Sequence, residues 1–261
     1  MSNLALALRD SSTMLRRNLL HARRYPSLTL NLLLTPVMLL LLFVYVFGDA
    51  MSAGIGGGDR SDYIAYIVPG LLLMTIGSTT IGTAVSVAND MTEGIIARFR
   101  TMAIHRGSVL VGHVVGSVVQ SILSVVLVGA VGVAIGFRSA DATALEWLAA
   151  FGLLVLFTLA LTWIAVGMGL VSPNAEAASN NAMPLIFLPL ISSAFVPVDS
   201  MPGWFQPVAE YQPFTPAIET LRGLLLGTGI GHNGWLAVVW SLALTALGYL
   251  WATAKFNNAP K

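Results

Sequence analysis

Six charge-poor stretches, each about as long as a bilayer-crossing helix, make up most of this 261-residue chain. A helix needs about 20 mainly apolar residues to cover roughly 30 Å of hydrocarbon. The fifth stretch fits least well, because Pro184 and Pro189 lie inside it. The pattern predicts an all-α integral membrane protein with six transmembrane helices. The stretches are 28–47, 64–88, 109–135, 148–171, 182–198 and 235–254.

The composition agrees with a membrane protein. Hydrophobic residues are 56% of the chain and charged residues 10%, whereas soluble domains carry about 25% charged residues. The chain has no cysteine, which excludes disulfides and thiolate metal sites. The first apolar stretch is longer than the core of a signal peptide, and no small-x-small cleavage site follows it. We therefore expect it to be a retained helix.

Basic residues gather on one side of the predicted membrane. Ten of the thirteen precede the first stretch, lie between the second and third, or follow the sixth. That side has four acidic residues, whereas the opposite side has three basic and eight acidic residues. Positively charged segments stay in the cytoplasm, so both termini are predicted to be cytoplasmic. An even number of spans agrees with this orientation.

Residues 3–25 have the pattern of an amphipathic helix that lies on the membrane surface. Apolar residues share one helical face, and three arginines spaced seven apart occupy another. Such a helix lies in the interface with its basic side chains toward anionic headgroups. The alternative, an ordinary basic flank, explains the arginines but not the leucine spacing. The apolar residues are Leu4, Leu8, Leu15, Leu19 and Ala22, and the arginines are Arg9, Arg16 and Arg23.

The segment 199–231 is too apolar for a solvated loop, and several prolines interrupt it. Irregular backbone at membrane depth is tolerated only where protein or a water-filled cavity satisfies its polar groups. We therefore predict short re-entrant helices in the outer leaflet, with Trp204 and Tyr211 at headgroup level. Alternatively, these aromatic residues form a plain interfacial belt. Glu219 and Arg222 are three residues apart, a spacing that allows them to pair on one helix.

The main cytoplasmic loop, 89–106, has the pattern of a short helix. Asp90 and Glu93 resemble a capping box, which predicts that a helix starts at about Thr92. Its apolar face is suited to a groove on a soluble partner. Alternatively, the face rests on the cytoplasmic ends of the chain's own helices. That face consists of Ile95, Phe99 and Met102, flanked by Arg98 and Arg100.

The sequence contains no recognisable catalytic set. His21, His105, His113 and His232 are scattered, and none is spaced from an acid or a second histidine as metal ligands are. We expect His113 to be an interfacial residue rather than a ligand. An intramembrane enzyme acting on lipids would have only Asp90, Glu93, His105 and His113 as candidate groups.

Transport by the chain alone is also disfavoured. No acidic or basic residue lies deep in any apolar stretch, although ion-coupled carriers use such residues as relays. The chain lacks the Gly-Lys-Ser/Thr ending of a phosphate-binding loop. If this protein performs work, another chain must supply the energy.

The order of these elements resembles the type-2 ATP-binding-cassette export permeases, and within them the daunorubicin-resistance branch of actinobacteria. The resemblance covers essentially the whole chain. One departure is that the family often has proline after the loop arginines, where this chain reads Thr101-Met102-Ala103-Ile104. The most specific residues are Glu93 and Gly94 with Arg98 and Arg100, then Pro197, Pro202 and Trp204, and finally Pro213, Pro216, Glu219 and Arg222.

The resemblance implies a permease subunit of the plasma membrane that is not itself an enzyme. It would move hydrophobic or amphiphilic cargo, such as a drug, lipid or glycolipid, out of the cytoplasm. Its partners would be two ATPase subunits that bind ATP and magnesium, a second permease copy or a sibling permease, and membrane lipids. Neither a cofactor of its own nor nucleic acid is expected.

The resemblance also assigns roles within one transmembrane domain, 1–261. Residues 3–25 would be the connecting helix and 90–103 the coupling helix that docks on the ATPase. The segment 199–231 would form re-entrant helices that close the exit. The coupling residues would be Asp90, Glu93, Gly94, Arg98, Phe99 and Arg100. The exit residues would be Pro197, Pro202, Trp204, Pro213, Pro216, Glu219 and Arg222.

Overall fold

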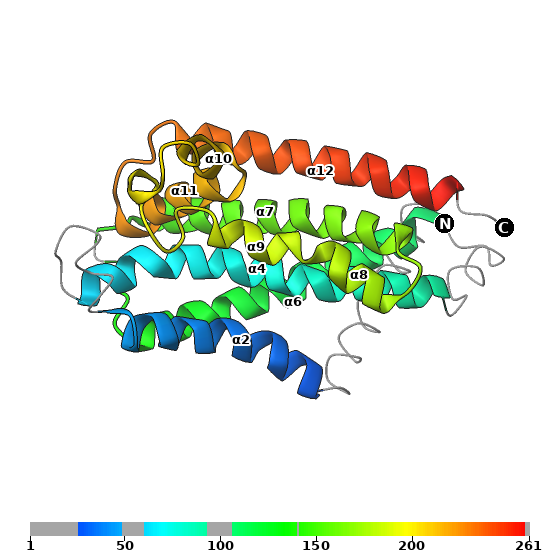
Figure 1. Ribbon diagram of the computed structural model, residues 1–261, viewed down its shortest axis with the longest axis horizontal. Coiled ribbons are helices and arrows are strands. Elements are labelled where there is room, and N and C mark those ends of the chain that lie inside the picture. The colour runs from blue at the N-terminus through cyan, green and yellow to red at the C-terminus, as the bar shows by residue number, and fades with distance from the viewer. Residues whose placement is uncertain (1–25, 49–59, 93–105, 140, 259–261) are drawn as a thin grey trace.

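The computed structural model describes residues 26–48, 60–92, 106–139 and 141–258. Over these ranges the protein is built of helices and contains no strand, as predicted. The long helices lie side by side in one elongated bundle (Figure 1). They are α2 (Pro26–Tyr45), α4 (Arg60–Thr92), α6 (Arg106–Ala134), α7 (Ala144–Val171) and α12 (Asn233–Asn258).

Shorter helices join α7 to α12. Two of them, α8 (Ala175–Ala182) and α9 (Pro184–Leu190), follow one another along the bundle. The 3-10 helix η2 (Val198–Ser200) and helices α10 (Gln206–Tyr211) and α11 (Phe214–Leu226) gather at one end of it. The last described residues of α12 lie at the opposite end (Figure 1).

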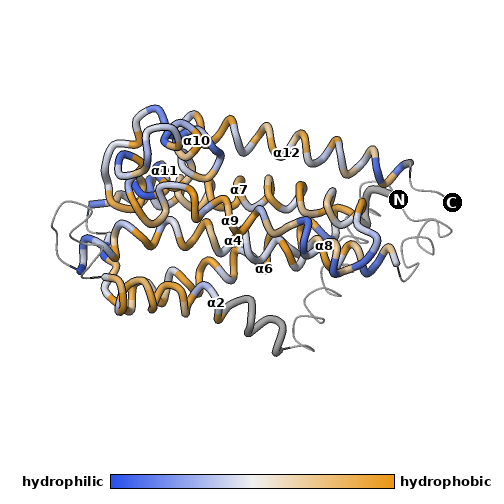
Figure 2. Tube along the Cα trace, in the orientation of Figure 1, coloured by the Kyte–Doolittle hydropathy of each residue, from blue (hydrophilic) through white to orange (hydrophobic). Residues whose placement is uncertain are grey.

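Four of the described helices, α4, α6, α7 and α12, are long and apolar enough to cross a membrane. They coincide with four of the six predicted stretches. The predicted first span coincides with α2, whose side chains are described from Leu34, and Leu34–Tyr45 is apolar. Hydrophobic residues occur along the whole length of the long helices (Figure 2). Several of them are exposed, including Leu123, Leu247 and Leu250. Lipid can cover such side chains without the cost that water would impose.

Helix α4 is the central element of the bundle. Of the most apolar 18-residue stretch of α4, 78% is buried inside the protein, compared with 22% of the corresponding stretch of α12. It packs against α2, α6, α7, α8, α9 and α11. The fully buried Ile67, Leu71 and Ile76 belong to the main hydrophobic cluster of the protein. Any change that moves α4 therefore reaches most of the other helices.

Glycines allow backbone to approach α4 closely. A Cβ atom at Gly70 would lie 2.7 Å from the Cα of Ala194, and one at Gly77 would overlap the carbonyl oxygen of Leu185. These glycines are two helical turns apart, so they present one face of α4 to α9 and the turn after it. Small residues serve this purpose in membrane helices, where close packing replaces the hydrophobic effect as the driving force.

The fifth predicted span, 182–198, is not a single helix. Helix α8 ends at Ala182, α9 begins at Pro184, and turns follow Leu190. Proline has no backbone N–H to donate, and its ring collides with the preceding helical turn. Beyond α9, Ile191 donates to the carbonyl of Leu188 in a tight turn. The expectation of one continuous helix was therefore wrong, because the segment breaks beside Pro184 and α9 ends at Leu190, one residue after Pro189.

Replacing Gly77 by alanine should destabilise the protein. The new methyl group meets rigid backbone at Leu185, and such overpacking costs about 1–3 kcal/mol. Gly152→Ala on α7 is the matched control, because nothing lies within 4 Å of its Cβ position. Thermal unfolding in detergent should show a midpoint several degrees lower for Gly77→Ala and an unchanged or higher midpoint for Gly152→Ala. Equal midpoints would contradict the close approach of α4 and α9.

Candidate functional site

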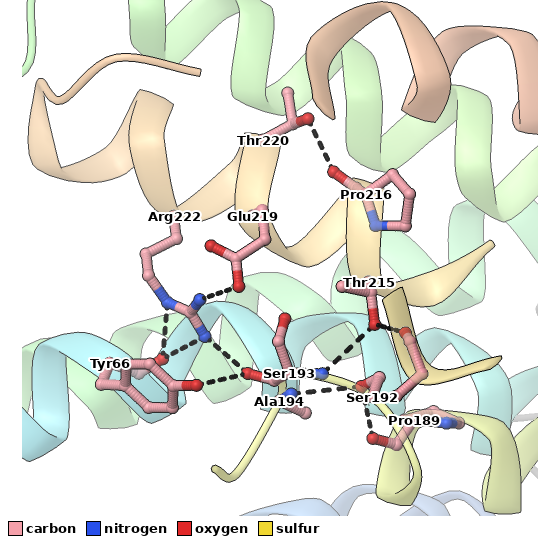
Figure 3. Close-up of polar contacts among 11 residues, drawn as sticks. Tyr66, Pro189, Ser192, Ser193, Ala194, Thr215, Pro216, Glu219, Thr220 and Arg222 are labelled. Atoms are coloured by element: carbon pink, nitrogen blue, oxygen red, sulfur yellow. Dashed lines mark hydrogen bonds and ion pairs between the residues drawn. The ribbon is translucent and has the colours of Figure 1, made fainter. Parts of the chain in front are cut away.

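A buried polar site lies at the end of the bundle that carries α10 and α11. It brings together the first part of α4, the turn after α9, and α11 (Figure 3). Its centre is Arg222 of α11, which is only 9% exposed. A buried charge is costly unless it is paired and hydrogen-bonded. The surroundings of Arg222 therefore determine whether this end of the protein is stable.

All three guanidinium nitrogens of Arg222 have partners. Nη1 donates to Oε1 of Glu219 at 2.6 Å, and Nη2 donates to the carbonyl of Ser193 at 2.8 Å. Nε and Nη2 also donate to the carbonyl of Tyr66 at 3.2 and 3.1 Å. The guanidinium carbon lies 3.8 Å from the centre of the Tyr66 ring, a favourable cation–π contact. The predicted pairing of Glu219 with Arg222 is thus confirmed.

The turn after α9 is held by side chains from two other helices. The carbonyl of Ser193 accepts from Arg222 and also from the Tyr66 hydroxyl, at 2.9 Å. The Ser193 N–H donates to Oγ1 of Thr215 at 3.2 Å, and that hydroxyl donates to the carbonyl of Ala209 at 2.5 Å. Backbone groups that leave a helix in an apolar environment must find such partners. Helices α4 and α11 thus fix this turn together, and α10 holds the Thr215 side chain in place.

The side chain of Ser192 also forms hydrogen bonds within this turn. The Ser192 hydroxyl donates to the carbonyl of Pro189 at 2.5 Å and accepts from the N–H of Ala194 at 3.1 Å. It therefore replaces the hydrogen bonds lost where the helix stops. Phe195 packs against Phe43 of α2, with ring centres 4.5 Å apart. The turn after α9 therefore also contacts α2.

The predicted exit residues come from the same end of the protein. Pro197 precedes η2, and Pro213 precedes α11. Pro216 is buried in the first turn of α11. Trp204 is 80% exposed, and its ring meets that of Phe205 edge-on. Pro202 accepts backbone hydrogen bonds at its carbonyl from Phe205 and Gln206.

The aromatic residue at the end of α10 also links to α12. The carbonyl of Tyr211 accepts from the indole N–H of Trp240 at 3.0 Å. The Tyr211 side chain is itself 56% exposed. The rings of Tyr211 and Trp204 are therefore both on the surface of this end of the bundle.

Sequence reasoning missed three residues of this site: Tyr66, Ser193 and Thr215. Tyr66 is 156 residues from Arg222, so no spacing rule links them. A usable signal was present in one case. Tyr66 is an aromatic residue with a polar tip inside an apolar stretch, and a buried tyrosine hydroxyl generally finds a hydrogen-bond partner.

The predicted coupling segment is only partly described. Glu93, Gly94, Arg98, Phe99 and Arg100 lie outside the described residues, as does the predicted connecting helix 3–25. Helix α4 continues through Asp90 to Thr92. The interpretation of Asp90 as the cap of a new helix that starts at about Thr92 was therefore wrong. Continuous helical backbone bonding and packing outweigh the local capping preference there.

Asp90 is instead buried and paired. Its Oδ2 lies 2.9 Å from Nε2 of His113 on α6, and the two residues are 7% and 5% exposed. His113, which we expected to be an interfacial residue rather than a ligand, thus has an acidic partner that the sequence spacing did not indicate. Tertiary packing brings together an acid and a histidine that are 23 residues apart. Among the residues that the structure describes, no three His, Asp or Glu side chains gather as a metal site.

Replacing Arg222 by lysine should destabilise the end of the bundle. Lysine keeps the charge but lacks the planar fork that reaches several oxygens at once. Each buried acceptor left without a donor costs about 1–3 kcal/mol. Arg138→Lys is the control, because Arg138 is an exposed arginine that also donates to backbone carbonyls. Thermal unfolding in detergent should show a lower midpoint only for Arg222→Lys, and equal midpoints would refute this structural role.

Comparison with known proteins shows to which family this chain belongs. The sequence model of the family described as "ABC-2 type transporter" matches residues 10–226, a range that includes Tyr66, Ser193 and Arg222. The chain is similar to a daunorubicin resistance ABC transporter permease protein of Streptomyces coeruleorubidus. The two are 28% identical over 228 residues, which cover 86% of this chain and 77% of the relative.

Two more distant relatives extend the comparison. A probable doxorubicin resistance ABC transporter permease protein of Mycobacterium tuberculosis (strain ATCC 25618 / H37Rv) is 24% identical over 166 residues, or 62% of this chain and 58% of the relative. Nodulation protein J of Rhizobium meliloti (strain 1021) is 24% identical over 213 residues, which cover 74% of each chain.

Proposed function

Because the chain belongs to the ABC-2 type transporter family, we propose that it is the membrane subunit of an ATP-driven exporter of amphiphilic cargo. Proteins of this family are permeases, a transport component rather than an enzyme. The observation that carries the proposal is the similarity to a drug-resistance permease over 86% of the chain. Aromatic amphiphiles such as daunorubicin are therefore the first cargo to test, with lipids and glycolipids as the alternatives.

The proposed topology has six membrane crossings, formed by α2, α4, α6, α7, the α8–α9 segment and α12. Support for the fifth crossing comes from contacts along α4, which the segment after α7 meets at successively earlier positions. From Ala84 to Gly70, α4 rises about 21 Å at 1.5 Å per residue, most of the roughly 30 Å of hydrocarbon. Gly169, two residues before the end of α7, lies against Ala84. The segment after α7 then meets Gly77 through Leu185 and Gly70 through Ala194.

The distribution of charge supports an orientation. The end of the bundle with α10 and α11 would face outward, and both termini would be cytoplasmic at the plasma membrane. Helices η2, α10 and α11 would then form the re-entrant segment that closes the exit. Trp204 and Tyr211 would lie among the outer headgroups, where amphipathic aromatic rings are enriched.

A second permease copy or a sibling permease would cover α8 and α9. These helices expose polar side chains along the proposed fifth crossing, and polar groups facing hydrocarbon are costly. A second permease or a water-filled path between two permeases would remove that cost. The exposed polar residues are Glu176, Asn180 and Asn181, and the exposed apolar ones are Met183, Phe187 and Leu190.

Two ATPase subunits, which would bind ATP and magnesium, would dock on the cytoplasmic segment 90–103. Asp90 at the end of α4 belongs to this segment. The remaining proposed coupling residues are Glu93, Gly94, Arg98, Phe99 and Arg100. Because α4 and α6 flank the segment directly, a force applied to it reaches the bundle through these two helices.

Replacing Phe99 by alanine should uncouple ATP hydrolysis from transport. Loss of an aromatic anchor at an interface costs about 2 kcal/mol or more, a more than tenfold loss of docking affinity. The measurement is ATP-dependent uptake of daunorubicin into inside-out vesicles that contain the permease and its ATPase. Uptake should fall to background for Phe99→Ala, while ATP hydrolysis continues.

The control for this experiment is Leu247→Ala on α12. Leu247 is 61% exposed on the proposed lipid-facing side, and its replacement should leave uptake unchanged. Wild-type uptake in Phe99→Ala would contradict the coupling role of that residue. Absence of ATP-dependent uptake with the wild-type permease would contradict drug export itself.

A further inference from the structure

Three buried side-chain pairs join α4 to α6, and of their six residues the proposed function uses only Asp90. Each pair connects the two helices directly, with one polar side chain from each. All six residues are at most 8% exposed. We name this set the α4–α6 polar seam. It consists of Thr79 with Ser121 (2.6 Å between hydroxyl oxygens), Thr83 with Ser117, and Asp90 with His113 (2.9 Å).

The spacing of the seam follows from helix geometry. His113, Ser117 and Ser121 are four residues apart on α6, which places them on one face. Their partners on α4 rise in number as those on α6 fall, as antiparallel helices require. The seam therefore extends along the inner half of the helix pair and ends two residues before the end of α4.

Polar pairs fix the register of two helices in a way that apolar contacts do not. If one helix slides by one turn along an apolar face of another, it loses apolar contacts and gains similar ones. The same slide along the seam would leave hydroxyl groups and the Asp90 carboxylate buried without these partners. Leaving a buried polar group unsatisfied costs more than the hydrogen bond itself contributes. The seam thus opposes sliding and separation of α4 and α6.

The other end of α4 carries the Arg222 site. Tyr66 lies 13 residues before Thr79 on the same helix, or about 20 Å at 1.5 Å per residue. Between them, Gly70 and Gly77 meet the backbone of the segment that contains α9. A displacement of α4 at its inner end is therefore transmitted to the turn after α9 and to α11.

We propose that the seam residues are positioning residues for transport. They join α4 and α6 into one rigid unit, so that movement of the segment between these helices displaces both together. Helix α4 then delivers that displacement to the Arg222 site at the outer end. The proposal rests on the proposed function, since it assigns to the seam the transmission of a push from the ATPase.

Thr83→Val combined with Ser117→Ala removes the central pair and leaves no unsatisfied hydroxyl behind. The matched control is Thr80→Val. Thr80 is fully buried on the same helix, but its hydroxyl donates to the carbonyl of Gly77 within α4. Both variants replace buried hydroxyls by apolar atoms, and only the double variant breaks a link to α6.

The measurement is the amount of daunorubicin taken up per ATP hydrolysed by the permease–ATPase complex in inside-out vesicles. The double variant should lower this ratio about fivefold, as expected for the loss of one buried hydrogen bond between the helices. Thr80→Val should keep the wild-type ratio. A purely structural role would reduce the amount of complex, and with it uptake and hydrolysis alike, without changing the ratio.

A disulfide between α4 and α6 provides a second test, which strengthens the link between the helices instead of removing it. Because the chain has no cysteine, Thr83→Cys with Ser117→Cys introduces one defined pair. Their present side chains are in contact, which is close enough for a disulfide. Oxidation should cross-link the helices and keep the wild-type ratio, because the proposal requires α4 and α6 to move as one unit.

Five outcomes separate the possibilities. A lowered ratio in the double variant together with transport by the cross-linked form supports the proposal. An unchanged ratio in the double variant, failure of the disulfide to form, or loss of transport on cross-linking overturns it. If the wild-type complex takes up no daunorubicin, the proposed function fails, and the role of the seam fails with it.

Discussion

Backbone carbonyl and N–H groups inside a bilayer have no water to bind, so every departure from regular helix needs partners within the protein. In this chain one such departure is the turn that follows α9, which ends one residue after Pro189. Arg222 and Tyr66 supply the partners, since both donate to the Ser193 carbonyl. The guanidinium group is held in turn by Glu219 and by the Tyr66 ring. The broken helix is stable only with α4 and α11 beside it.

Helix α4 connects the two ends of the protein. The C-terminal half of α4 is joined to α6 by the polar seam. Its middle meets the α9 backbone at Gly77, and its first turns carry Tyr66. In the proposed exporter this arrangement links the segment that contacts the ATPase to the segment that closes the exit. Apolar contacts supply the bulk of the packing, and a few polar contacts define how the helices are positioned.

Most of the architecture was predictable from the sequence, because charge-poor stretches of bilayer length leave few alternatives. The pairing of Glu219 with Arg222 was predictable as well, because both residues lie on one helical face. The contacts of Arg222 with Tyr66 and of Asp90 with His113 were not. They join separate helices, and no periodicity within one helix encodes which neighbour it meets. The fifth stretch was predicted as one continuous helix, because hydrophobicity alone does not show where a proline interrupts a helix.

The central structural claim is that the segment from α8 to η2 traverses the membrane despite its break. Single cysteines at Glu176 and Asp199, both in exposed positions, test it directly in a chain that has none of its own. A membrane-impermeant maleimide added to intact cells should label position 199 and leave position 176 unlabelled until the membrane is opened. Labelling of both positions from the same side would mean that this segment turns back within the bilayer.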